Sequence, residues 1–165
     1  MKIIIVCMAI LTITQIQPQD TIKKVRKNNM TVGWKMEKEY IHFEMEAPTN
    51  GWVAIGFNET KSLAGTYLLM GRIRNGKAEV LEYYTEKPGS YKPIADLGIP
   101  NRVISISGHE KGNLTKLKFS VPIGKSSKYH KQLSTDSKWT MLLAYSLDDD
   151  FQHHSIMRTS VNIKL

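Results

Sequence analysis

The sequence predicts an all-β protein, an immunoglobulin-like antiparallel β-sandwich of about nine strands. Several segments alternate apolar and polar residues with a period of two, which is typical of strands with one buried face. Gly, Pro and Asn-Gly turn signals separate these segments at short intervals. No stretch has a convincing apolar period of 3.6 residues, so long helices are not expected. Many short strands with turns between them favour a sandwich, and 165 residues suit one domain.

The first residues have the composition of a targeting segment. A positive start at Lys2 is followed by an almost wholly apolar run over residues 3–14 and then by polar residues. This order predicts a signal peptide over residues 1–19 and a secreted, periplasmic or extracellular protein. An uncleaved N-terminal anchor is the alternative. Residues 20–29 are expected to form a flexible lead, and residues 30–165 the β-sandwich domain.

Charge and cysteine content limit the function classes. The net charge is +8 at pH 7, but the lysines are scattered and no basic run is interleaved with aromatic residues. Nucleic acid is therefore not an expected partner. The only cysteine, Cys7, lies within the predicted signal peptide, so the mature domain would contain neither a thiol nor a disulfide. A monomer is expected.

Two hairpins frame the predicted strand order. Residues 32–36 and 41–47 alternate around the loop 37–39, and residues 103–106 and 114–121 flank a turn at 109–112. The other predicted strands are 51–57, 67–71, 78–84, 139–146 and an edge strand at 156–165. Residues 85–101 are predicted to be a long irregular loop, and the polar residues 124–137 to hold at most one short helical turn.

The most informative run is Gly51-Trp52-Val53-Ala54-Ile55-Gly56-Phe57. Seven residues without a charge suit a central strand that is buried on both faces. The two glycines leave room for a bulky group to approach the backbone closely.

The segment 148–154 combines three aspartates with His153 and His154. Two imidazoles and three carboxylates could bind a metal ion. Adjacent strand residues point to opposite faces, so the two histidines would share an ion only in a loop or bulge. A solvated turn, a single-His ligand and a multi-carboxylate metal site are therefore all open.

Met70 has two interpretations. Methionine in a strand is ordinarily a core residue. Met paired with His is also an axial pair for haem iron, and a sandwich could bring Met70 near His154. The sequence contains no nucleophile elbow, zinc-protease motif or phosphate loop, so the protein is not expected to be an enzyme.

Three signatures together resemble the DOMON family of secreted β-sandwich domains, over roughly residues 30–165. They are the 51–57 run, the turn 63–66 before the apolar strand 67–70 and the Asn75-Gly76 turn, and the closing segment 153–161. The resemblance implies a domain that binds haem b or, in some members, a sugar. It implies redox or electron transfer outside the cytoplasm, with a membrane-bound or soluble redox partner.

The resemblance also implies ligand positions. In cytochrome-type members a Met and a His hold the haem iron, and the Met often lies in a turn that corresponds to Leu63 here. The His corresponds to His153 or His154, with His154 preferred because it is nearer the edge strand. The implied site residues are Trp52, Leu63, Tyr67, Met70, His153 and His154.

Two further functions are open at this point. A carbohydrate- or surface-binding module would use Trp52, Tyr67 and Tyr83 to line its pocket, without iron. A structural or partner-binding domain would have an ordinary filled core, and the leucine at position 63 favours it.

Overall fold

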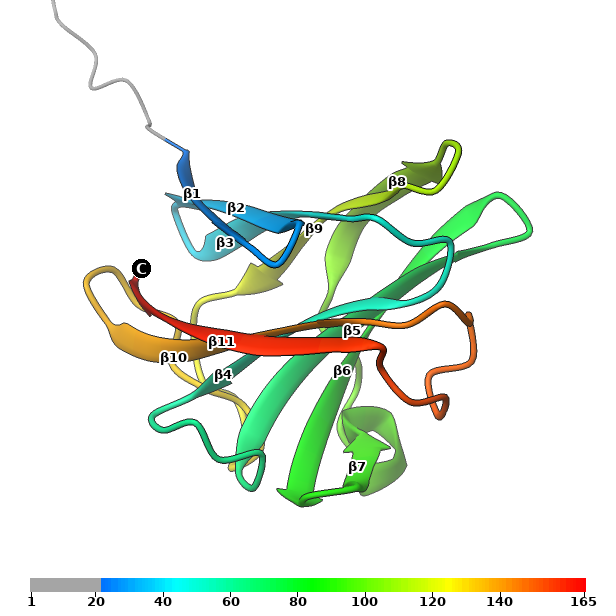
Figure 1. Ribbon diagram of the computed structural model, residues 1–165. Coiled ribbons are helices and arrows are strands. Elements are labelled where there is room, and N and C mark those ends of the chain that lie inside the picture. Colours follow the sequence, from blue (N-terminus) through cyan, green and yellow to red (C-terminus); the bar gives the residue numbers. More distant parts are fainter. Residues whose placement is uncertain (1–21) are drawn as a thin grey trace, which may run out of the picture.

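The computed structural model describes residues 22–165, so the predicted signal peptide at 1–19 lies outside the described residues. Two antiparallel sheets pack face to face, which confirms the β-sandwich (Figure 1). Sheet A has the order β1-β2-β3-β9-β8, and sheet B has the order β11-β10-β4-β5-β6-β7. The strands of sheet A are β1 (Lys23–Lys27), β2 (Met30–Glu37), β3 (Tyr40–Ala47), β8 (Ile104–Glu110) and β9 (Thr115–Pro122). Those of sheet B are β4 (Val53–Asn58), β5 (Thr66–Arg74), β6 (Lys77–Lys87), β7 (Ser90–Pro93), β10 (Lys138–Tyr145) and β11 (Met157–Lys164).

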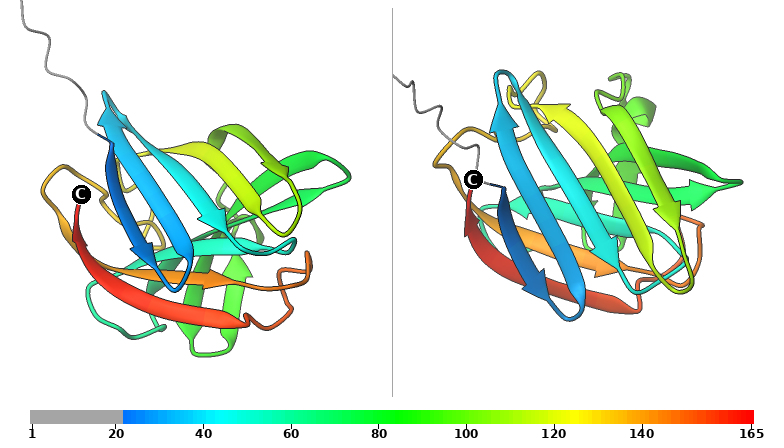
Figure 2. Two further views of the ribbon diagram at one scale, coloured as in Figure 1. Left: turned by 45° about the horizontal axis from the view of Figure 1, so that its top comes forward. Right: turned by 90° about the horizontal axis from the view of Figure 1, so that it is seen from above.

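The core lies between the sheets, as the period-two patterns predict. In sheet A, Val32 of β2 is aligned with Met45 of β3, which is aligned with Leu117 of β9, and all three are fully buried. The opposite face of sheet A has charged side chains, such as the ion pair between Lys116 and Glu46. Figure 2 shows the strands of sheet A running across those of sheet B.

Strand β4 is the central strand that the 51–57 run predicts. It pairs with β10 on one side and with β5 on the other. All six of its residues are buried, because Val53, Ile55 and Phe57 enter the main core and the alternate residues lie on the covered outer face. This prediction is confirmed.

The segment expected to be a flexible lead instead contains an edge strand. Lys23–Lys27 forms β1 and pairs with β2 through the turn Asn28-Asn29, whose φ angles are 48° and 63°. Asparagine accepts a positive φ more readily than most residues, and a type I′ hairpin turn requires a positive φ at both of its central positions. The Asn-Asn pair was the sequence signal for this hairpin.

The segment 85–101 is more regular than predicted. Strand β6 continues to Lys87, and a turn at Gly89, with φ of 78°, leads into β7. Pro93 ends β7, where it is tolerated because β7 is the edge of sheet B. A short 3₁₀ helix, η1 (Ile94–Leu97), follows. These additions, together with β1, explain why the described residues contain eleven strands and not about nine.

Residues 124–137 form a loop of turns and contain no helical turn. This loop covers one end of the core, where Leu133 and His130 are almost fully buried. Within residues 22–165, no helix is long and apolar enough to cross a membrane.

Candidate ligand-binding site

The outer face of sheet B contains an unusual row of small side chains. Strand pairing aligns Arg158 of β11 with Ala144 of β10, Ala144 with Ala54 of β4, and Ala54 with Met70 of β5. Two alanines thus lie between a cation at one end and a thioether at the other. Short side chains in the middle of a sheet face leave a depression that longer neighbours surround.

The next row along the strands deepens this depression. It aligns Ser160, Leu142, Gly56 and Leu68. A Cβ atom built on Gly56 would lie 2.6 Å from Leu68 Cδ2 and 2.8 Å from Thr66 Cγ2. Both distances are shorter than real contacts, so these side chains lie over Gly56 only because it has no side chain. Gly56 is thus the close-approach glycine that the sequence predicts.

A pocket with a volume of about 270 Å³ lies over these rows. This is near the lower end of the usual range for ligand pockets, roughly 300–1,000 Å³. Its lining includes apolar residues from β10, β4 and β5, and polar residues from the segment that precedes β11. Five of the six predicted site residues line it, namely Trp52, Leu63, Met70, His153 and His154.

The segment 146–156 is fixed to the sheet by its backbone. The indole Nε1 of Trp52 donates to the carbonyl of His153 at 3.2 Å, and the hydroxyl of Ser146 donates to the carbonyl of His154 at 3.0 Å. Tyr91 donates to the carbonyl of Phe151 at 2.5 Å. Both histidines therefore have an anchored main chain, while their side chains are exposed at the pocket.

Arg72 fixes the same segment from its other end. Its guanidinium donates to the carbonyl of Asp149 at 2.7 Å, pairs with Glu79 at 2.7 Å, and lies 4.2 Å from the centre of the Phe151 ring. Burial raises the pKa of the Asp149 carboxyl, and the charge of Arg72 partly offsets this increase.

In the part of the chain that the structure describes, no three His, Asp or Glu side chains are grouped closely enough to hold a metal ion.

Met70 forms part of the pocket floor. Only 3% of it is exposed, because it packs in a small apolar cluster with Trp52, Tyr83 and Phe151. This cluster gives the Met70 thioether the packed environment of an ordinary core methionine at the edge of a ligand pocket. In the same cluster, burial raises the pKa of Tyr83 to about 12, so the Tyr83 hydroxyl stays protonated at neutral pH.

Leu63 reaches the pocket on a loop that Asn58 organises. The amide nitrogen of Asn58 contacts the carbonyls of Ser62 and Ala64 and the hydroxyl of Thr66, at 2.7–3.0 Å. Asn58 is buried, so these contacts satisfy an amide that has little access to water. The loop thus holds Leu63 in the lining of the pocket.

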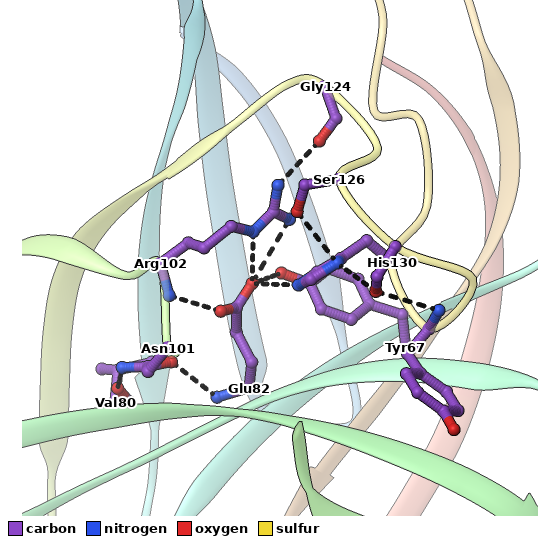
Figure 3. Close-up of polar contacts among 10 residues, drawn as sticks. Tyr67, Val80, Glu82, Asn101, Arg102, Gly124, Ser126 and His130 are labelled. Atoms are coloured by element: carbon purple, nitrogen blue, oxygen red, sulfur yellow. Dashed lines mark hydrogen bonds and ion pairs between the residues drawn. The ribbon is translucent and has the colours of Figure 1, made fainter. Parts of the chain in front are cut away.

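Tyr67 does not line this pocket. It follows Thr66 on β5 and points into the space between the sheets, where it is fully buried. Its hydroxyl donates to the Glu82 carboxylate at 2.5 Å (Figure 3). Burial, and then the charge of Glu82, raise the pKa of Tyr67 well above its usual value. Strand alternation explains why Tyr67 lies between the sheets and not at the predicted site, because neighbouring residues of β5 face opposite sides of sheet B.

Glu82 is the centre of a buried polar cluster. The Arg102 backbone amide donates to Glu82 at 2.5 Å, and the Arg102 guanidinium and the His130 Nε2 atom each lie 3.4 Å from Glu82 Oε1 (Figure 3). Burial alone would raise the pKa of Glu82, but its contacts with His130, Tyr67 and Arg102 hold that pKa below its usual value. The cluster joins β5 and β6 to the loop 124–137.

Several pocket residues were not predicted from the sequence. Leu142 and Ala144 were expected only as part of an apolar strand, and Tyr91 lies in the segment expected to be irregular. Arg158 was quoted within the 153–161 signature without a role. Residues alternate between the two faces of a strand, so Leu142 and Ala144 lie on the face of β10 opposite Met141 and Leu143. This alternation is the sequence signal that could have identified Leu142 and Ala144 as pocket residues.

The model of the DOMON domain matches residues 26–146 of this sequence. The chain belongs to the DOMON domain family. Its relatives include DBH-like monooxygenase protein 1 of Mus musculus, which is 27% identical over 142 residues, covering 80% of this chain and 21% of the relative. MOXD1 homolog 2 of Drosophila melanogaster is 25% identical over 117 residues, covering 70% and 15%. This DOMON domain thus spans about a fifth or less of the length of these curated relatives.

Solved structures with the same fold include two cytochrome domains. The cytochrome b domain of pyranose dehydrogenase from Coprinopsis cinerea superposes on this DOMON domain with a TM-score of 0.59, at 8% identity, covering 87% of this chain and 81% of that one. The cytochrome domain of Myriococcum thermophilum cellobiose dehydrogenase has a TM-score of 0.55, at 9% identity and the same coverage. At these identities the likeness establishes the sandwich architecture.

Proposed function

We propose that this DOMON domain binds haem b in the outer-face pocket of sheet B and takes part in electron transfer. The observation that carries this proposal is the pocket itself, which combines an apolar floor of small and branched side chains with two exposed imidazoles at its edge. The cytochrome b domains that share the fold add support.

The residues present fit a haem group. Ala54 and Ala144 form a floor of short side chains, which suits a flat apolar ring. An imidazole is a common protein ligand of haem iron, and His154 presents one on a fixed main chain. Haem iron supplies one-electron redox chemistry when bound. We assign the ligand role to His154, with His153 as its neighbour at the pocket edge.

The second axial position is where this chain differs from the cytochrome-type pattern. Leu63 has no atom that can ligate iron, and Met70 is buried in an apolar cluster with Trp52 and Phe151. Among the described residues that line the pocket, the strong iron ligands are then the imidazoles of His153 and His154, and His154 is the one we assign. This arrangement supports a pocket that holds haem by one imidazole and by apolar contact.

The domain's role would be to carry electrons to or from another protein. A redox partner, membrane-bound or soluble, would then donate or accept the electrons. The predicted signal peptide supports placing this activity outside the cytoplasm, where secreted DOMON domains act.

The carbohydrate alternative has less support from the geometry. It required Trp52, Tyr67 and Tyr83 to line the pocket, but Tyr67 lies between the sheets and only 4% of Trp52 and 3% of Tyr83 are exposed. These rings have no free face on which a sugar could stack. The alternative of a domain with no ligand site leaves the pocket on sheet B unexplained.

The test of the proposal is a titration of residues 20–165 with hemin, followed by absorbance in the oxidised and reduced states. We expect saturation at one hemin per protein, with a sharp Soret band. Quenching of tryptophan fluorescence should reach its limit at the same ratio, because Trp52 borders the pocket. A broad spectrum like that of free hemin at all ratios would overturn the proposal.

A Leu63→Met variant should gain a second iron ligand. The substitution keeps the side-chain volume and usually costs less than about 1.5 kcal/mol of stability. We expect the reduced hemin complex of Leu63→Met to show sharper α and β bands than the wild type. Leu81→Met is the control, because Leu81 packs near Met70 without lining the pocket. Identical spectra for all three proteins would show that Leu63 does not face the iron.

A further inference from the structure

Arg158 differs from every other residue that lines the pocket. It is the only Lys, Arg, Asp or Glu in the lining, where no carboxylate is present to pair with it. It is exposed, and within residues 22–165 its guanidinium makes neither a hydrogen bond nor an ion pair. Some other cations on the outer surfaces have a carboxylate partner, such as Arg72 with Glu79 and Lys164 with Asp136, and others have none. What sets Arg158 apart is its place in the lining of the pocket.

The position of Arg158 directs its side chain to the pocket. Residue 158 faces outward on β11, in register with Ala144, which is followed across the sheet by Ala54. Neither alanine is long enough to block the guanidinium, so a ligand lying over them would contact it at one end. Arg158 is thus an edge of the same depression that His154 borders.

An unpaired arginine at an apolar pocket has a defined chemical preference. The guanidinium is always charged and has a planar set of donors that matches a carboxylate with two parallel hydrogen bonds. With no acid in the lining, the local charge favours a negative group on the ligand. The alternative explanation is that Arg158, on an edge strand, serves only to prevent pairing with another strand. In that case replacing Arg158 would not change ligand binding.

We propose that Arg158 anchors a carboxylate of the ligand, so that the pocket selects flat or extended apolar molecules that have an anionic group at one end. For haem b, as in the function proposed above, this group is a propionate. Arg158 is therefore a specificity-determining residue, distinct from the imidazole that holds the iron.

The test compares two probes that differ only in the carboxylates. Wild type and the variants Arg158→Gln and Arg158→Lys are titrated with hemin and with hemin dimethyl ester, in the same dilute detergent, by quenching of tryptophan fluorescence. Lys164→Gln is the matched control, because it removes one positive charge from the same face of β11 outside the pocket. Thermal unfolding of each variant shows whether it is folded.

We expect Arg158→Gln to weaken hemin binding about tenfold, in line with the loss of a hydrogen bond to a charged group. Its affinity for the dimethyl ester should equal that of the wild type, and Arg158→Lys should recover part of the loss. Lys164→Gln should bind both probes as the wild type does. Equal affinity of wild type and Arg158→Gln for hemin, or an equal loss for both probes, would overturn the role of Arg158.

A failure of the haem function is distinguishable from a failure of this inference. If wild type binds neither porphyrin, the proposed function fails, and the same variants are titrated with a naturally fluorescent polyene fatty acid and its methyl ester. Selective binding of the acid that Arg158→Gln weakens would support the carboxylate anchor without iron. Binding of neither compound, or equal binding of both, would overturn it.

Discussion

Replacement of Glu82 by alanine is expected to lower the free energy of unfolding by about 3–5 kcal/mol. Its side chain is fully buried and contacts Tyr67, Arg102 and His130. Removing the carboxylate would leave the Arg102 charge and two buried polar groups without their partner, which costs more than the original interactions gain. The loss would loosen both the β5–β6 pair and the loop 124–137.

Urea unfolding at pH 7 measures this effect. Glu79→Ala is the matched control, since Glu79 lies on the same strand and forms an ion pair with Arg72 on the outer face, where its side chain is 40% exposed. Exposed pairs contribute about 0–1 kcal/mol, so the control should lose little stability. Equal losses for Glu79→Ala and Glu82→Ala would contradict the structural role assigned to the buried cluster.

The same cluster predicts a dependence on pH. The folded pKa of Glu82 is below its usual value, so its contribution is fully present above the unfolded pKa of about 4.3 and is lost as pH falls through the folded pKa. The wild type should therefore lose more stability than Glu82→Gln between pH 5 and pH 3, roughly one pH unit on either side of the pKa of a free carboxyl. Parallel stability curves for the two proteins would show that Glu82 does not ionise as described.

A Gly51→Ala variant should show the second large effect, a loss of about 1–3 kcal/mol with weaker ligand binding. A Cβ atom at position 51 would lie 2.5 Å from the Asp148 amide nitrogen and 2.6 Å from the Ser146 carbonyl oxygen. Both are main-chain atoms, so relief requires the segment 146–148 to move. This shift would break the hydrogen bond from the Trp52 amide to the Asp148 carbonyl, at 3.0 Å, and displace the histidines that follow.

Gly33→Ala is the control for Gly51→Ala. A Cβ atom at Gly33 would lie 3.5 Å from the side chains of Ile22 and Lys24 and 3.7 Å from the Lys23 carbonyl oxygen, which are ordinary contacts. Thermal unfolding and hemin titration of both variants should separate them, with Gly33→Ala close to the wild type. A Gly51→Ala protein with wild-type stability and affinity would show that the segment does not depend on close packing at position 51.

The sequence predicted the fold well where one physical pattern dominated. Alternation identified β3 and β9, and the uncharged 51–57 run identified the central strand β4. The pattern failed for β1, whose Lys-rich sequence resembles a solvated lead. This strand is stabilised by main-chain pairing with β2, and Lys27 reaches the Ser160 carbonyl of the other sheet at 2.7 Å. Such long-range contacts are not visible in local composition.

The candidate site was predicted in part. The resemblance brought together His154, Leu63 and Trp52, and the structure places all three at one pocket. Tyr67 was assigned to it because it lies within the 63–70 signature, on the same predicted strand as Met70. An odd separation along a strand puts two residues on opposite faces, and that rule would have placed Tyr67 in the core. Arg158 required knowledge of which strand lies beside β10, which only the folded sheet supplies.

The most direct test of the haem proposal is the absorbance spectrum of a His154→Ala variant reconstituted with hemin, with and without added imidazole. We predict that His154→Ala loses the sharp Soret band and that imidazole restores it by occupying the space of the missing side chain, while His153→Ala keeps the wild-type spectrum. A His154→Ala protein with the wild-type spectrum, unchanged by imidazole, would contradict the assignment of His154 as the residue that holds the iron.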